Sequence, residues 1–372
     1  MVAGLLLARE VSDLCIGKPP IRWLPPSSTV ARAVAELEAD GGPGAAVAVW
    51  DGQDGAAVVG RVRMADVLLF LCAGDGSSLQ ATLADLLAAA GAPPVRRVEP
   101  DASVLEAVDA LLGGAQSLVV PIRDHRHRRR PETAQLDAES MCWVTVEDVV
   151  RFFLGSVALF SQIALRSVSD LGAVRPACSA LAVAPGDDAL STITPLLRTA
   201  LATHASVAAV SGRCLVGEIS PWPLCTLDAS IASSFVDSGR GTREAAIRPR
   251  NLIDQSSPSS SSSSSPCASS SSSSSEDEHD DEKNVASAFA TTSRHAKFSA
   301  RCTKGIIACR RGSSLVAVMA QAVAHRVTQV WVLDDEPEEE EEELVGVVGL
   351  LDVIRVLRRH LLHAPPAEST AE

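Results

Sequence analysis

The chain has 372 residues and a formal net charge of −13 at pH 7, a length that allows two or three domains and a charge that argues against a general nucleic-acid binder. Hydrophobic residues make up 46% of the sequence, but aromatic residues make up only 3% and tyrosine is absent. The cores must therefore be aliphatic, and we expect no aromatic platform for stacking single-stranded nucleic acid.

The N-terminal sequence gives no sign of export or membrane insertion. The apolar run in "MVAGLLLARE" is too short to span a bilayer, and no basic segment precedes it. The nine cysteines form no CxxC pair, so neither a disulfide framework nor a zinc site is indicated. We expect an intracellular protein, placed in the cytoplasm, with cysteines that are small buried side chains in a reducing compartment.

The first unit along the chain, residues 11–71, has the order strand, helix, strand, strand, helix. A lead-in "IRWLPP" precedes "SSTVARAVAELEAD", which has helical apolar spacing. Two strands, "AAVAVWD" and "VVGRVR", follow, and "MADVLLFL" is the second helix. The unit is therefore predicted to be a small α/β module.

The second unit, residues 82–155, repeats this order most clearly. The strand "VRRVEP" leads to a helix with Asp101 or Ser103 as its N-cap and Gly113-Gly114 at its end. "AQSLVVPI" and "CWVT" are predicted strands, and "VEDVVRFFLG" is an amphipathic helix.

Two further units complete the pattern. In residues 167–225 the unit is degenerate, because Pro223 removes an amide donor after the first turn of the last helix. In residues 301–363 the order is intact, from "GIIAC" to "LDVIRVLRRHLL". The string "VSDL" occurs at 11–14 and again at 168–171, ahead of each pair of units. The chain is therefore a duplicated pair of similar modules.

Three polar segments interrupt the units. Residues 226–300 are rich in serine and acid and have few large apolar residues, a composition that predicts disorder. The basic loop 123–140 and the glutamate run 336–343 occupy the same place in two different units. Both are interpreted as solvated loops, with an acidic partner or RNA as the alternative for the basic one. Ser272 to Ser275, just before Glu276, would suit an acid-directed kinase or be a plain spacer.

The strings "VVGRVRMADVLLFL" and "LVGVVGLLDVIRVL" resemble the CBS (cystathionine β-synthase) domain, with its glycine, its hydrophobic strand and its aspartate at the start of the last helix. The whole chain apart from the insertions resembles a plant protein of the four-repeat, CBS-domain-only type. The arrangement is also similar to the gamma subunit of AMP-activated protein kinase. The resemblance implies an α/β fold with four β-α-β-β-α repeats in two Bateman modules.

The resemblance also implies a site for adenine nucleotides. The family pattern is Gly-x-h-[Ser/Thr]-x-x-Asp, in which the hydroxyl contacts phosphate and the aspartate binds the ribose. Thr145 and Asp148 match its end in the second unit, although Cys142 replaces the glycine. Asp66 and Asp352 match in the first and fourth units, where Arg63 and Gly349 replace the hydroxyl. The third unit keeps Gly217 and Ser220 but has Pro223 in place of the aspartate.

Each of these residues also has a purely structural interpretation. Thr145 and Asp148 fit a helix capping box, Asp66 and Asp352 fit favourable charges at helix N-termini, and Ser220 fits an N-cap. His325-Arg326 fits cations at a helix C-terminus. His360 and His363 share a helix face, but no third metal ligand is near in sequence.

No catalytic motif is recognisable: GxSxG, GxxxxGK[ST] and HExxH are all absent from the sequence. We therefore expect a non-enzymatic regulatory or sensor protein that needs no cofactor and modulates a partner enzyme or kinase. AMP, ADP or ATP is the candidate ligand, and self-association through the modules is the candidate oligomer. The alternative is an interaction scaffold, or a gamma-like kinase subunit, that has lost nucleotide binding.

Overall fold

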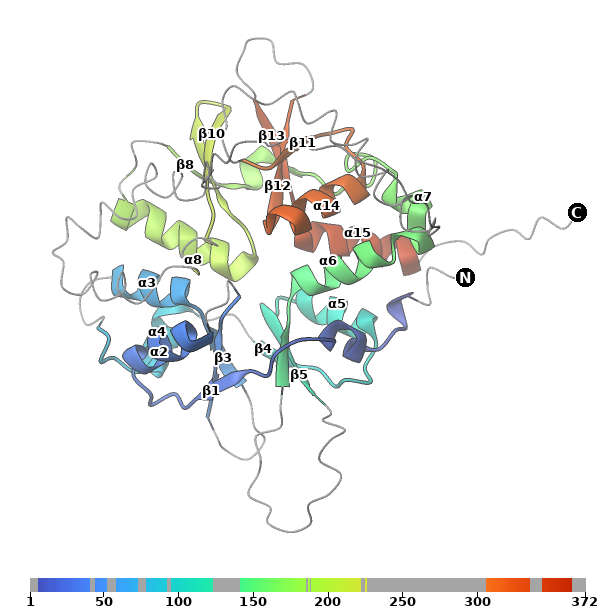
Figure 1. The fold of residues 1–372 in the computed structure, drawn as a ribbon. Coiled ribbons are helices and arrows are strands. Elements are labelled where there is room, and N and C mark those ends of the chain that lie inside the picture. Colours follow the sequence, from blue (N-terminus) through green and yellow to red (C-terminus); the bar gives the residue numbers. More distant parts are fainter. Residues whose placement is uncertain are drawn as a thin grey trace, which may run out of the picture.

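The computed structural model places four small sheets and their helices around a common centre (Figure 1). The residues it describes are 6–40, 44–51, 58–72, 78–91, 95–122, 141–184, 187, 189–221, 225, 306–334 and 343–362. The predicted insertions at 123–140 and 226–300 lie outside them, as do Pro223, His363 and nearly all of the glutamate run.

All four repeats have the same connectivity. The first two strands of each sheet are parallel, because a helix crosses between them, and the second and third are antiparallel. The first repeat comprises β1 (Arg22–Leu24), α2 (Val30–Asp40), β2 (Val47–Trp50), β3 (Val58–Val62) and α3 (Met64–Cys72). The second comprises β4 (Val95–Arg97), α5 (Val104–Leu112), β5 (Ser117–Pro121), β6 (Met141–Val144) and α6 (Val146–Gly155).

In the second half of the chain the fourth repeat follows the same order, and the third follows it as far as its last strand, where the described residues nearly end. The third comprises β8 (Leu181–Val183), the π-helical turn η5 (Ala189–Ile193), α8 (Thr194–Thr203), β9 (Val207–Ser211) and β10 (Cys214–Ile219). The fourth comprises β11 (Ala308–Arg310), α14 (Leu315–His325), β12 (Gln329–Leu333), β13 (Leu344–Gly349) and α15 (Leu350–Leu362). The prediction of an α/β fold with four such repeats is confirmed.

Local capping explains where several helices begin. The Ser103 hydroxyl accepts a hydrogen bond from the Glu106 amide at 3.2 Å, so Ser103 rather than Asp101 is the N-cap of α5. The Ser314 hydroxyl accepts in the same way from Ala317 at 3.3 Å at the start of α14. At the end of α5, Gly114 has φ +102°, a conformation that glycine adopts without strain.

Further elements lie before or between the repeats: η1 (Val11–Cys15), α4 (Leu83–Ala90), η3 (Val157–Phe160), α7 (Ser161–Ala164), β7 (Arg175–Pro176) and η4 (Ala177–Ser179). The segments that lead into each pair of repeats contact the second repeat of that pair. The Val11 amide donates to Ala102 of the second repeat at 2.8 Å, and the Val168 amide donates to Ser313 of the fourth at 2.9 Å. Both "VSDL" strings thus precede one repeat in sequence and pack on the next one in space.

Two aliphatic cores hold the four repeats together. One joins the helices of the first and third repeats, with Leu69 and Leu197 in the same buried cluster; the other joins those of the second and fourth, with Phe153 and Leu357. Figure 1 shows these helices meeting across the middle of the molecule, with the sheets toward its outer ends. Burying one large aliphatic or aromatic side chain contributes roughly 1.5–3 kcal/mol to stability. The many such side chains in these two cores therefore hold the two modules together through their helices.

The sheets pack within a module instead. Ala48 of the first repeat and Val119 of the second share one small buried cluster, and Ala208 and Trp331 share another in the third and fourth. The helices therefore form the interface between the two modules, and the sheets form the interface between the two repeats of each module. No helix in the described part of the chain has the length and apolar character needed to cross a membrane.

Candidate functional site

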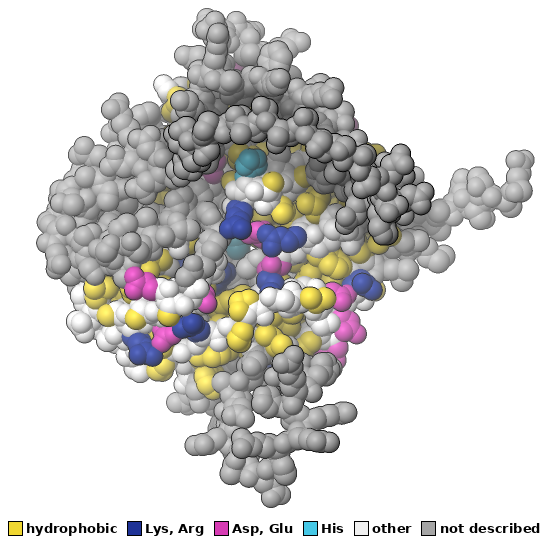
Figure 2. All heavy atoms as spheres, in the orientation of Figure 1, with side chains coloured by type: hydrophobic (Ala, Val, Ile, Leu, Met, Phe, Trp, Pro, Cys, Tyr) yellow, Lys and Arg dark blue, Asp and Glu magenta, His cyan; other side chains and the backbone are white. Residues whose placement is uncertain are grey.

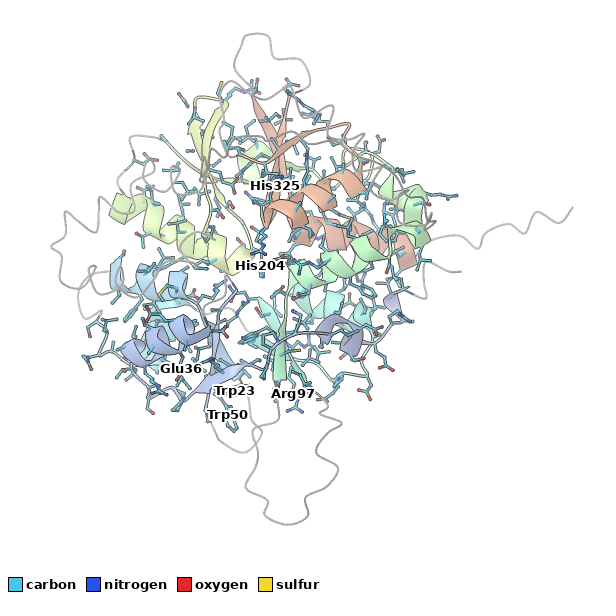
Figure 3. The ribbon with its side chains drawn as sticks, in the orientation of Figure 1. Trp23, Glu36, Trp50, Arg97, His204 and His325 are labelled. Atoms are coloured by element: carbon cyan, nitrogen blue, oxygen red, sulfur yellow. The ribbon has the colours of Figure 1, made fainter. Side chains whose placement is uncertain are left out.

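A cavity of about 430 Å³ lies where the four repeats meet. Its volume is in the range of small-ligand sites, roughly 300–1,000 Å³. Every repeat contributes to its wall: Arg61 from the first, Thr145 from the second, His204 from the third and Arg326 from the fourth. Figure 3 shows His204 near the centre of the molecule.

The wall of this central cavity carries an excess of positive charge. Six cationic side chains line it, against three carboxylates. The cations are Lys18, Arg22, Arg61, Arg63, Arg151 and Arg326, and the carboxylates are Asp40, Glu147 and Asp148. Figure 2 shows basic side chains gathered near the centre of this face, with acidic ones among them. An anion is therefore the ligand that the wall favours.

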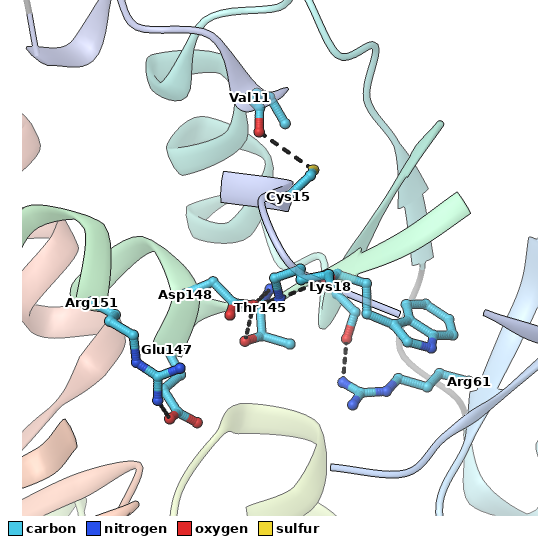
Figure 4. Close-up of polar contacts among 10 residues, drawn as sticks. Val11, Cys15, Lys18, Arg61, Thr145, Glu147, Asp148 and Arg151 are labelled. Atoms are coloured by element: carbon cyan, nitrogen blue, oxygen red, sulfur yellow. Dashed lines mark hydrogen bonds and ion pairs between the residues drawn. The ribbon is translucent and has the colours of Figure 1, made fainter. Parts of the chain in front are cut away.

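Thr145 and Asp148 lie in the cavity wall, where α6 begins. Asp148 Oδ2 accepts hydrogen bonds from the Thr145 amide at 2.7 Å and from the Thr145 hydroxyl at 2.8 Å. Lys18 Nζ lies 2.6 Å from the same oxygen and also donates to the Trp143 carbonyl at 2.8 Å (Figure 4). Thr145 and Asp148 thus cap the helix and face a ligand-sized space at once, so the two interpretations are compatible.

Asp66 occupies the equivalent position in the first repeat. Its Oδ2 accepts from the amide and from Nε of Arg63, both at 2.9 Å. Arg63 is therefore folded onto Asp66 and is not free in this state. Asp66 lines a separate small cavity of about 20 Å³, which has room for about one water.

Asp352 has the same capping role in the fourth repeat but lies outside the lining of the central cavity. Its side chain is only 6% exposed and its Oδ2 accepts from the Gly349 amide at 3.0 Å and from Arg175 Nε at 2.7 Å. Arg355 donates to its other oxygen at 2.6 Å. In the third repeat, Ser220 does line the central cavity.

His204 and Arg326 are functional candidates that the sequence patterns did not single out in this role. They are the two non-glycine residues with positive φ among those described, at 53° and 54°. Each ends the first helix of its repeat, three residues before the next strand, where the second repeat has Gly114. Left-handed backbone is costly for a side chain with Cβ, and such residues gather at functional sites. Aligning the helix ends would have revealed them.

The environment of His204 keeps its imidazole neutral at pH 7. Burial, followed by the charges of Arg63 and Arg61, lowers the pKa of His204 to about 4, although a hydrogen bond with the Gln116 backbone opposes this. Its Nε2 is shielded from solvent and has no hydrogen-bond partner among the described residues. A buried polar atom left without a partner costs about 1–3 kcal/mol, so this nitrogen is a candidate contact for a ligand.

Arg61 shows a similar deficit. Its guanidinium donates to the Ser117 hydroxyl at 2.7 Å and lies 5.1 Å from the centroid of the Trp143 ring. Burial and the charge of Arg63 lower the pKa of Arg61 to about 10, so it stays cationic at neutral pH. Its Nε is buried and without a partner within the described ranges.

No cluster of three or more His, Cys, Asp or Glu side chains among the described residues could hold a metal ion. The pairing of His360 with His363, for which the sequence offers no third ligand, cannot be followed because His363 lies outside those residues.

Comparisons with known proteins agree with this architecture. No protein-family model matches the chain. It is 31% identical to the CBS domain-containing protein CBSX5 of Arabidopsis thaliana, over 96% of this chain and 98% of that protein. It is 22% identical to CBSX6 of the same plant, over 96% and 95%. The crystal structure of protein MJ1225 from Methanocaldococcus jannaschii, described as a candidate archaeal homologue of g-AMPK, matches with a TM-score of 0.57 at 12% identity, covering 93% of this chain and 99% of that one.

Proposed function

The chain belongs to the family of CBS domain-containing proteins, and from this premise we propose that it is a non-enzymatic regulatory protein whose central cavity binds an adenine nucleotide. The ligand would bias the two modules between states of different affinity for a partner protein. A ligand can do so only if it binds those states unequally.

The observation that carries this proposal is a cavity wall that is rich in cations and has two buried nitrogen atoms without hydrogen-bond partners among the described residues. Arg61 and His204 each keep a buried nitrogen without a hydrogen-bond partner among the described residues, and Arg326 adds a cation from the opposite module. Phosphate oxygens would accept from Arg61 Nε, whereas the neutral His204, which already donates one N–H to the Gln116 backbone, offers Nε2 as an acceptor to a ligand amino or hydroxyl group. A neutral ligand would leave the excess charge of the wall unbalanced.

Asp148 is our candidate for the ribose contact. A carboxylate can accept hydrogen bonds from both vicinal hydroxyls, and the start of α6 favours a nearby anion. Lys18 now lies on the same carboxylate oxygen, at 2.6 Å. A bound nucleotide would therefore compete with Lys18 for Asp148, and the displaced ammonium would be available to phosphate. Asp66 and Asp352 are weaker candidates, because arginines already occupy both.

A second candidate function is an interaction scaffold, alone or as a gamma-like kinase subunit, without a small ligand. The observation in its favour is that Asp66, Asp148 and Asp352 all cap their own helices and all have a cationic partner. Under this hypothesis the three carboxylates are purely structural. Self-association and a partner enzyme or kinase remain proposals under either function.

Thermal melting of the full-length protein with millimolar AMP, ADP, ATP or S-adenosylmethionine tests the proposal. A ligand at 100 times its dissociation constant adds about 2.7 kcal/mol of stability. We expect at least one of the nucleotides to raise Tm of the wild type. Asp148→Asn should abolish that rise.

Asp352→Asn is the matched control, because it removes an equivalent carboxylate charge and its ion pair with Arg175 away from the central cavity. Its own Tm should fall, but the nucleotide should still raise it. If no adenine ligand moves the wild type, the scaffold function is favoured. If both variants lose the response equally, Asp148 is not a ligand contact.

A further inference from the structure

A carboxyl group lies buried between the two sheets of the second module. Glu218 belongs to β10 of the third repeat and is only 7% exposed. Trp331 of β12, in the fourth repeat, is fully buried and donates from Nε1 to Glu218 Oε2 at 2.9 Å. Figure 1 shows β10 and β12 beside each other at the top of the molecule. This hydrogen bond therefore joins the two sheets across their interface.

A hydrophobic cluster fills this interface and leaves the carboxyl group poorly solvated. Ser206 lies two positions before Ala208, the residue opposite Glu218, which places the serine on the same face of the sheet. Glu218 Oε1 and Ser206 Oγ are both shielded from solvent, and neither has a hydrogen-bond partner among the described residues. The buried cluster comprises Ala208, Leu215, Trp331, Leu333, Leu344 and Val347.

The first module shows that the fold forms without an acid at this position. Arg61 stands opposite Ala48 in β2 as Glu218 stands opposite Ala208 in β9, so the two side chains occupy matching positions. Arg61 lines the central cavity, whereas Glu218 does not. The acid is therefore a feature of the second module alone, and the sheet interface encloses it.

This environment favours the neutral form of the acid. Ionisation would leave a charge in an apolar interface, where Trp331 is its one donor within the described residues. The polar groups that face it are Ser206 at the start of β9 and Trp331 in β12. Burial raises the pKa of Glu218, these two polar groups oppose the rise, and no charged side chain contributes. In the neutral form the carboxyl O–H is a donor, for which Ser206 Oγ is an acceptor on the same face.

We propose that Glu218 is a proton-dependent latch of the second module, which closes the interface between the sheets of the third and fourth repeats as a neutral acid and loosens it as a carboxylate. The folded state binds this proton more firmly than the unfolded chain does. The contribution of Glu218 to stability is therefore complete below the ordinary pKa of a glutamate and is lost as pH rises through the raised pKa. The latch does not depend on nucleotide binding, because it lies outside the central cavity.

Thermal melting of the full-length wild type and of Glu218→Gln between about pH 5 and pH 9 tests the latch. Glutamine has nearly the same shape, accepts from Trp331 and does not ionise. The difference between the two melting temperatures at each pH removes the titrations that both proteins share. We expect Tm of the wild type to fall relative to that of Glu218→Gln by at least about 3 °C as pH rises. Glu106→Gln, which changes an exposed glutamate, should give a profile parallel to that of the wild type.

Two further measurements locate the effect. Trp331→Phe removes the donor that favours the carboxylate, so its loss of stability should move to higher pH than in the wild type. Hydrogen exchange, corrected for its intrinsic pH dependence, reports local opening. At high pH the amides of β9 and β12 should exchange faster in the wild type than in Glu218→Gln, whereas those of β2 and β5 should exchange alike in the two proteins.

Carbon-13 NMR of glutamate carboxyl groups provides a direct measurement if Glu218→Gln is too unstable to compare. One glutamate of the wild type should titrate at higher pH than the rest, and Trp331→Phe should move that signal further upward. A wild type whose glutamates all titrate together, or a difference in Tm that stays constant with pH, would overturn the latch. Equal opening of the two modules at high pH would also overturn it, because the effect would then not come from Glu218.

Discussion

The two modules of this protein share one framework but use it differently. We call residues 11–20 and the matching residues 168–177 the lead-ins of the two modules. In the first module, Lys18 of the lead-in lies 2.6 Å from Asp148; in the second, Arg175 of the lead-in lies 2.7 Å from Asp352. Both aspartates also accept the amide of the residue three positions earlier. Yet only Asp148 lies in the lining of the central cavity. The repeated cap and ion pair therefore belong to the fold, and the surrounding side chains decide whether a site exists.

The comparison extends to the position that faces each lead-in. A Cβ on Gly346 would lie 2.4 Å from the Arg175 carbonyl oxygen and 2.7 Å from Val174 Cγ1. In the first module the same position carries the buried Cys142, and the residues before β1 form no strand on β6 of the kind that β7 forms on β13. In the second module β7 lies against Gly346 and the side chain of Asp352 is 6% exposed, whereas in the first module the matching position holds a cysteine and the side chain of Asp148 is 15% exposed.

The largest effect on stability should come from placing a cysteine, the residue at 142 in the first module, at the matching position 346 of the second. Gly346→Cys should lower the free energy of unfolding by about 3 kcal/mol, because the backbone of β7 cannot easily move away. The reciprocal Cys142→Gly should cost only about 1 kcal/mol, for lost burial and a more flexible strand. Denaturant titration of both variants measures the difference. Equal costs would mean that the two lead-ins are packed alike.

A smaller effect concerns the pH dependence of stability that His204 adds at a position where the second repeat has Gly114 and the fourth has Arg326. The pKa of His204 falls to about 4 on folding, against about 6.5 in an unfolded chain. The unfolded chain therefore binds a proton first as pH drops. The contribution of neutral His204 to stability is complete above about pH 6.5 and is lost as pH falls toward 4.

His204→Asn should make the protein less sensitive to acid in this window. Asparagine tolerates the left-handed backbone, so the fold should be kept. We expect the loss of stability between pH 7 and pH 4.5 to be smaller in the variant by about 1–2 kcal/mol, after allowance for partial exposure. Chemical denaturation at several pH values measures this. Parallel profiles for the two proteins would contradict a buried neutral histidine.

The smallest effect concerns the strained helix ends. Replacing Arg326 by the glycine that the second repeat uses there should raise stability by about 0.5–1 kcal/mol, because glycine adopts positive φ freely. The same change should weaken nucleotide binding, because it removes a cation from the cavity. Arg326→Ala removes the charge and keeps the strain, so the two variants should bind alike but differ in stability. A destabilised Arg326→Gly would show that the side chain, rather than a ligand, stabilises this end.

Much of the fold was predictable because its determinants are local. Hydrophobic periodicity showed the order of strands and helices in all four repeats, and Ser103 was one of two expected caps. Thr145 and Asp148 were visible as a pair because a helix start brings residues i and i+3 together. The identity of the two "VSDL" strings showed the duplication. It did not show that the first string packs on the second repeat and the second string on the fourth.

The repeats, their caps and the three aspartates at helix starts follow from the sequence, since each depends on residues a few positions apart. Which of these aspartates lines the central cavity depends on how distant segments pack together. Lys18, Arg61, His204 and Arg326 come from segments far apart in the chain, and no local pattern relates them. Their approach follows from helices that pack between modules and lead-ins that cross between repeats. Burial then removes solvent from His204 and Arg61 and lowers the pKa of both side chains. The sequence alone does not reveal such a shift.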